Sequence, residues 1–155
     1  MKTIFLTSCF DAYDKDINGN RIAKHFGNSN NILDNLKKHI KKYDNFLFVA
    51  SEETNTTNTD LYAKAIFDSF NLTLPFKKYT ILDIRTLDNI DELIKNADFI
   101  YLCGGHLPTQ NSFFNKINLK EKLENLECVI CGGSAGSMNC ADVVYCPPEV
   151  EGESL

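Results

Sequence analysis

The chain has 155 residues, of which 43% are hydrophobic and 24% are charged, and its formal net charge is −5. This length predicts a single domain over residues 1–155, because one core of that size can bury about 70% of the unfolded surface. Aromatic residues make up 11% of the chain, which argues against disorder. The acidic balance argues against a nucleic-acid partner, since no stripe of Lys and Arg is available to displace counterions from phosphates.

The first apolar run is too short to be the hydrophobic segment of a signal peptide or a membrane-spanning helix. It covers residues 3–6, and Asp11 soon follows. We therefore expect neither a signal peptide nor a membrane-spanning helix, and no membrane partner. Six cysteines without a secretory signal predict a cytoplasmic location, where thiols stay reduced.

Short apolar runs alternate with longer amphipathic segments along the chain. In chain order, the pattern predicts a strand at 2–7, a helix at 31–42, a strand at 45–50, a helix at 60–71, a strand at 79–84, a helix at 89–97, a strand at 98–103, helices at 109–117 and 119–125, a strand at 128–131 and a helix at 135–141. The strands lack two-residue alternation, which is typical of strands buried on both faces of a parallel sheet. The predicted fold class is therefore α/β, a three-layer αβα sandwich with a mostly parallel sheet of about five strands or more.

A polar loop between the first strand and the first helix resembles the start of an EF-hand. Asp14, Asp16 and Asn18 alternate along the chain, and Gly19 occupies the sixth position. The twelfth position is His25, where a calcium loop requires a bidentate Glu. We interpret the loop as an Asx-rich turn, with calcium binding as the alternative, and we expect neither a metal site nor a cofactor.

Cys128 and Cys131 form a C-x-x-C pattern on a predicted strand. Residues three apart on a strand point to opposite faces, so the pattern predicts neither a zinc site nor a disulfide. Together with Cys103, these residues are interpreted as small buried hydrophobes.

Residues 132–136 match the G-x-S-x-G motif of a nucleophile elbow. The motif follows the apolar strand ending at Cys131 and precedes a predicted helix, which is the context that an elbow requires. Such a turn presents the Ser134 hydroxyl at the end of the sheet, and Gly132 and Gly136 let strand and helix come close together. The N–H of Ala135 would face a developing oxyanion. The alternative is an ordinary Gly-rich turn or a phosphate site.

A second glycine pair, Gly104-Gly105, follows the strand at 98–103 and precedes His106. If that strand is a parallel neighbour of the elbow strand, its end lies beside Ser134, because ligands gather at the carboxyl ends of such strands. An oxyanion hole takes donors from two segments, and this loop would supply the second. A tight turn alone would also explain the pair.

Together, residues 101–110 (YLCGGHLPTQ) and 129–139 (VICGGSAGSMN) resemble the dipeptidase E and cyanophycinase family of serine peptidases. The resemblance runs from the first strand to about residue 153. It implies a class I glutamine-amidotransferase-like fold and a nucleophilic Ser134. It also implies oxyanion donors from Gly105, beside Gly104, and from Ala135. The expected reaction is acyl transfer from a small peptide or amide to the serine, followed by hydrolysis.

The chain departs from this family in its histidines. Family members take a general base from a His beyond the serine, whereas His25, His39 and His106 all precede Ser134. We therefore expect a poor catalyst and the absence of the C-terminal part of the family fold, because a serine without a base is a weak nucleophile.

Other residues near the presumed site have weaker support. His106 stands where the family commonly has Asn, and it is a candidate for contacting substrate, with a loop histidine bonded to backbone as the alternative. Glu149 is a candidate orienting carboxylate, with a solvated acidic tail as the alternative. His39, between lysines, is interpreted as solvated.

A second function is kept beside the peptidase, a non-catalytic binding or interaction domain on the same scaffold. A missing C-terminal part would also leave apolar surface or a sheet edge uncovered. Self-association to a homo-oligomer is therefore a further hypothesis.

Overall fold

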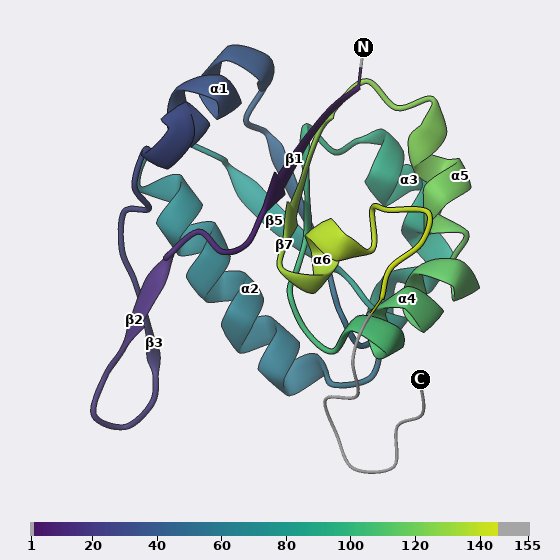
Figure 1. Cartoon of the computed structure of the whole chain (residues 1–155), viewed down its shortest axis with the longest axis horizontal. Coiled ribbons are helices and arrows are strands. Elements are labelled where there is room, and N and C mark those ends of the chain that lie inside the picture. Colours follow the sequence, from purple (N-terminus) through teal and green to yellow (C-terminus); the bar gives the residue numbers. More distant parts are fainter. Residues whose placement is uncertain (1, 146–155) are drawn as a thin grey trace.

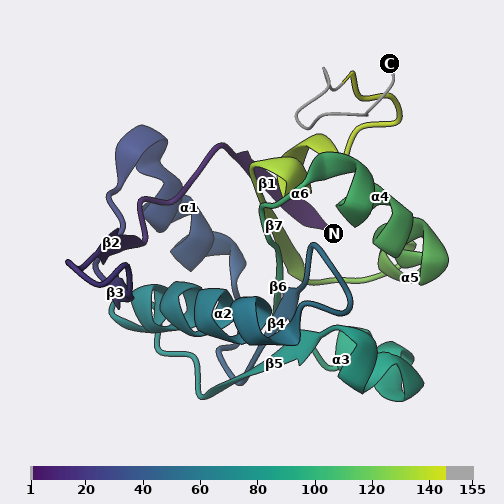
Figure 2. The same ribbon diagram turned by 90° about the horizontal axis from the view of Figure 1, so that it is seen from below.

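The computed structural model describes residues 2–145, and within them it forms a five-stranded parallel sheet between two layers of helices (Figures 1 and 2). The strands are β1 (Thr3–Thr7), β4 (Asn45–Val49), β5 (Lys78–Leu82), β6 (Phe99–Leu102) and β7 (Val129–Gly133). Their order is β1-β7-β6-β4-β5, and every neighbouring pair is parallel. Each of the five predicted strands is therefore present.

The helices cover both faces of this sheet, as Figure 2 shows most clearly. Their bounds are α1 (Ile32–His39), α2 (Thr56–Asn71), α3 (Ile90–Lys95), α4 (Leu107–Lys116), α5 (Leu119–Glu124) and α6 (Ala135–Met138), with 3-10 turns η1 (Ser29–Asn31) and η2 (Ile84–Asn89). One face carries α1 and α2, and the other carries α3, α4 and α5. The three-layer αβα prediction is confirmed. Across residues 2–145, the longest helices still fall short of the length and apolar character that a bilayer crossing demands.

Side chains on the central strand β4 show why the sheet is buried on both sides. Phe46 and Phe48 belong to an aromatic cluster beneath α1 and α2. Leu47 and Val49 point the other way, into an aliphatic cluster beneath α3, α4 and α5. All four are at most 2% exposed. An apolar run without alternation thus fills two cores at once, which is the behaviour that predicts a parallel sheet.

The edge strand β1 differs, because one of its faces is open. Ile4 and Leu6 are 45% and 61% exposed, on the strand that borders β7 alone. Lone exposed apolar residues are common on protein surfaces. Self-association through this edge stays a prediction.

The loop after β1 contains a structure that the sequence pattern missed. β2 (Tyr13–Lys15) and β3 (Arg21–Ala23) pair antiparallel as a short hairpin beside α2 (Figure 1). Asp16 closes its turn by accepting hydrogen bonds from the Asn20 Nδ2, at 2.9 Å, and from the backbone N–H groups of Asn20 and Asn18, both at 2.8 Å. The Asn20 side-chain bond first, and the backbone bonds after it, lower the pKa of this carboxyl. The predicted Asx turn is confirmed, but three-residue strands are too short to show a period.

Three helices differ by three or more residues from a predicted bound, and the first of them, α1, ends at His39 instead of residue 42. α2 begins at Thr56 instead of residue 60, because a stretch of Thr and Asn, which usually favours caps and turns, forms its first turn. Thr59 in that turn is buried, so tertiary packing outweighs the weak local preference. α6 ends at Met138 instead of residue 141.

Candidate active site

Ser134 stands in a strained turn between β7 and α6. Its φ of 51° and ψ of −119° are unfavourable for a residue with a Cβ, and its side chain is exposed. The Ser134 N–H donates a 3.0 Å hydrogen bond to the Thr7 carbonyl, which continues the pairing of β7 with β1. Such strain costs about 1–3 kcal/mol and is kept where surrounding structure enforces it. The hydroxyl is thus neither buried in the core nor placed inside a relaxed helix.

The glycines on either side of Ser134 permit close backbone approaches. A Cβ on Gly132 would lie 2.7 Å from the Ser137 nitrogen. A Cβ on Gly136 would overlap the carbonyl oxygen of Leu102, at the end of β6. Both neighbours are backbone atoms, which cannot move aside as a side chain can. The motif glycines are therefore required for α6 to turn back against the sheet, as the sequence predicts.

The Gly104-Gly105 loop lies against this turn. β6 pairs with β7 up to Leu102 opposite Gly132, so the two strands end side by side. A Cβ built on Gly104 would be 3.2 Å from the Ser134 Cβ and 3.8 Å from its Oγ. On the other side, a Cβ on Gly105 would overlap the Ser51 side chain, which follows β4. The predicted meeting of the two glycine segments is confirmed, and the oxyanion roles of Gly105 and Ala135 stay predictions.

Ser137 holds the turn to the edge strand, a role that the sequence analysis did not assign. Its Oγ accepts a 2.9 Å hydrogen bond from the Thr7 N–H. The same hydroxyl shares its proton between the carbonyl oxygens of Thr7, at 2.7 Å, and Gly132, at 2.6 Å. The sequence signal for this role was a hydroxyl residue three positions after Ser134, because a hydroxyl can both accept from the Thr7 N–H and donate to a backbone carbonyl.

Two amide side chains, one buried and one partly buried, connect the two segments, and the sequence analysis gave neither a role. Gln110 on α4 donates from Nε2 to the Cys103 carbonyl at 2.6 Å. Its Oε1 accepts from the Asn139 Nδ2, just beyond α6, at 2.9 Å. Both residues lie within the segments 101–110 and 129–139, so the sequence showed that they belong to the two motifs but not that their side chains are hydrogen-bonded to each other.

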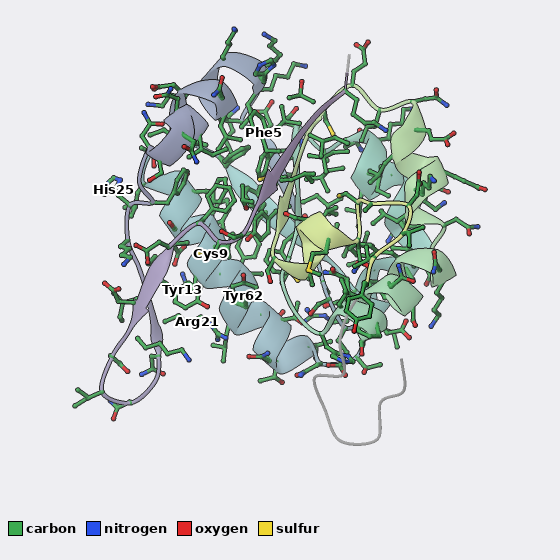
Figure 3. All side chains as sticks on the ribbon, viewed as in Figure 1. Phe5, Cys9, Tyr13, Arg21, His25 and Tyr62 are labelled. Carbon is green, nitrogen blue, oxygen red and sulfur yellow. The ribbon has the colours of Figure 1, made fainter. Side chains whose placement is uncertain are left out.

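The three histidines lie in different parts of the fold. His106 is the N-cap of α4, and its Nδ1 lies 2.7 Å from the Thr109 Oγ1. His39 packs edge-on against Phe5 on the α1 side, with its Nδ1 3.4 Å from the Thr3 Oγ1, so it is not simply solvated as the sequence suggested. His25 follows the hairpin, away from the elbow (Figure 3).

No general base is hydrogen-bonded to the Ser134 Oγ among residues 2–145. Glu149, the candidate orienting carboxylate, lies outside the described residues. The structure therefore brings together Ser134, Gly104, Gly105 and Ala135, and it leaves the acid–base part of the site unassigned.

A cluster of one arginine and three tyrosines, Arg21, Tyr13, Tyr62 and Tyr101, lies on the α2 side of the sheet. The Arg21 guanidinium lies 5.4 Å from the ring centres of both Tyr13 and Tyr62 (Figure 3). Tyr62 in turn hydrogen-bonds to Tyr101, and burial raises the Tyr62 pKa to about 12. A Cβ on Gly133 would lie 2.5 Å from the Tyr101 hydroxyl oxygen, so this cluster contacts the residue immediately before Ser134.

Two cavities lie away from Ser134. The larger, about 890 Å³, is at the amino ends of the strands, the opposite end of the sheet from the elbow. The smaller, about 450 Å³, lies between β1 and helices α4 and α5. Neither is lined by the motif glycines, so the elbow opens on the surface and not into these cavities.

The buried thiols near the site are not nucleophiles. Cys103, immediately before Gly104, is 2% exposed, and burial raises its pKa to about 12. Burial likewise raises the pKa of Cys128 to about 12 and that of Cys131 further. Cys128 and Cys131 belong to opposite cores, which confirms their predicted orientation. Because these thiols are both buried and protonated at neutral pH, they have the character of structural cysteines and are not candidates for the nucleophile.

We expect alkylation to distinguish these thiols from the exposed Cys9. Iodoacetamide at pH 8 should modify Cys9 in the native chain and spare Cys103 and Cys131, as peptide mass mapping would show, with a urea-unfolded sample as control. The Cys103 thiol ionises near pH 9 when unfolded and near 12 when folded. Stability from this group is therefore complete below pH 9 and is lost as the pH rises toward 12. Equal modification of Cys9 and Cys103 in the native chain would contradict this.

Comparison with known proteins finds similarity among solved structures. No protein-family model matches the chain, and no curated protein matches it. Among solved structures, the chain is similar to a crystal structure described as a "Putative Peptidase E Protein" from Listeria monocytogenes EGD-e, with 23% identity and a TM-score of 0.48. The similarity covers 89% of this chain and 61% of that one, so the chain spans about three-fifths of the length of that protein.

Proposed function

We propose that the chain is a hydrolase scaffold of the serine-peptidase type, in which Ser134 attacks the carbonyl carbon of a small peptide or amide. The observation that carries the proposal is the backbone of Ser134, a strained and exposed hydroxyl between two close-packed glycines. A Gly-rich turn without a catalytic role has no reason to keep a Cβ at a φ of 51°. The motif resemblance over residues 101–110 and 129–139 supports the same assignment.

In the proposed reaction, the Ser134 oxygen forms a bond to the carbonyl carbon, and the carbonyl oxygen becomes an oxyanion. The N–H groups of Gly105 and Ala135 are the proposed donors to that oxyanion, one from each strand end. The tetrahedral intermediate then re-forms the carbonyl as its C–N bond breaks, and the amine leaves with the proton that the Ser134 hydroxyl gave up. Water hydrolyses the acyl-serine and regenerates the hydroxyl.

Proton transfer limits the proposed activity of this chain. Among residues 2–145, no histidine or carboxylate side chain is hydrogen-bonded to the Ser134 Oγ. Positioning and oxyanion donors alone leave rates about 10³–10⁴-fold above water. This observation also favours the second candidate, a binding or interaction domain that keeps the elbow without turnover.

Labelling with a fluorophosphonate separates these two functions. We expect one molecule to attach per chain, at Ser134, and we expect Ser134→Ala to abolish the labelling. Ser112→Ala, at an exposed serine on α4, is the matched control and should label like the parent chain. Intact mass and peptide mapping give the measurement. A folded parent chain that takes up no label would refute the hydrolase and favour the binding domain.

A further inference from the structure

The side chain of Gln110 is a fully buried amide with both of its ends engaged. Gln110 is 0% exposed although it carries a polar group. Its Nε2 donates to the carbonyl of Cys103, the residue before Gly104, and its Oε1 accepts from Asn139. A polar group buried this deeply is costly unless each of its hydrogen bonds is made. One side chain thus joins the end of β6 to the end of α6.

Asn139 completes this bridge from the other side. It caps α6, and its N–H donates to the Ala135 carbonyl at 2.9 Å. Its Nδ2 also lies 3.3 Å from the Leu107 carbonyl at the start of α4, and its Oδ1 accepts from Asn111 at 3.2 Å. Asn139 therefore fixes the short helix that begins at Ala135 against α4.

The bridge lies where the sheet no longer controls the spacing. The pairing of β6 with β7 stops at Leu102 opposite Gly132, before either glycine turn. Beyond that point, Gly105 lies in the loop before α4 and Ala135 begins α6, so the two residues belong to separate segments. Gly136 lies so close to the carbonyl of Leu102 that a Cβ would not fit between them, which limits closer approach of the two segments but does not oppose their separation. The Gln110 amide, bonded to both segments, supplies that second restraint.

We propose that Gln110 and Asn139 are positioning residues, which hold the N–H groups of Gly105 and Ala135 at the separation that one oxyanion requires. The inference rests on the proposed function of Ser134. Donors must be held within about 0.5 Å of the productive geometry to be effective. Leucine or methionine at position 110 would fill the same space without fixing the distance between the two loops, since neither can bond to Cys103 and Asn139.

The test compares phosphonylation of Ser134 in Gln110→Met, Asn139→Ala and the double variant. The measurements are kinact and KI for a fluorophosphonate, whose P=O oxygen occupies the oxyanion position, and the Tm of each variant. We expect kinact to fall at least tenfold in each single variant, with KI little changed, because loss of an oxyanion donor costs about 10²–10³ in rate. The double variant should be no slower than the worse single one, because both changes remove the same bridge.

Ser112→Ala is the matched control, since Ser112 is exposed on the same helix and takes no part in the bridge between Gln110 and Asn139. It should keep the parent kinact. If Gln110→Met does not fold, Asn139→Ala alone decides, because Asn139 is only partly buried. Parent rates in folded variants would overturn the positioning role and leave the proposed function intact. A parent chain that takes up no label would overturn both.

Discussion

Ser134→Gly should abolish labelling and yet stabilise the fold. Glycine adopts a φ of 51° and a ψ of −119° without a Cβ clash, whereas alanine retains the strain. We expect the free energy of unfolding of Ser134→Gly to exceed that of Ser134→Ala by about 1–2 kcal/mol. Urea denaturation of the parent chain and both variants measures the difference.

Comparing glycine with alanine measures the free energy of backbone strain at residue 134 alone, because both variants lack the hydroxyl. A serine in an unstrained turn would give the opposite order, since glycine costs about 0.5–1 kcal/mol of conformational entropy relative to alanine. If Ser134→Gly is less stable than Ser134→Ala, the strained elbow is refuted. The outcome therefore tests the geometry on which the proposed nucleophile depends, independently of any substrate.

Among the glycines of residues 2–145, Gly136 should be the one at which substitution by alanine is most damaging. The new Cβ would overlap the Leu102 carbonyl oxygen and approach the Leu102 carbon at 2.7 Å and the Cys103 oxygen at 2.8 Å. These are backbone atoms of β6 and its end, so relief requires α6 to move off the sheet. Overpacking usually costs 1–3 kcal/mol, and we expect about 3 kcal/mol or more here.

The matched control is Gly27→Ala, whose Cβ would find its nearest neighbour, the Ser29 Oγ, at 4.0 Å. It should leave the free energy of unfolding within about 0.5 kcal/mol of the parent. Thermal and urea denaturation of both variants give the comparison. A Gly136→Ala chain as stable as Gly27→Ala would mean that α6 does not pack against the end of β6.

Residues 132–136 show how far a motif alone can lead. The spacing of Gly132, Ser134 and Gly136 after an apolar strand predicts the elbow, because only glycine permits so close an approach of strand and helix. The structure agrees at each of the three positions. The hairpin after β1 was missed, since its strands are held by an Asx turn and by contact with α2 and not by any periodicity.

The sequence by itself determined the chain order of the helices and of the five strands of the parallel sheet, the burial of that sheet on both faces and the location of the elbow. Each of these follows from the local spacing of apolar residues and glycines. Only the tertiary structure decided which segments meet. It paired β6 with β7 and so placed Gly104 against Ser134, and it joined Gln110 to Asn139 across 29 positions of the chain. A hydrogen bond between distant residues leaves no period in the sequence, because its geometry exists only once the strands have paired.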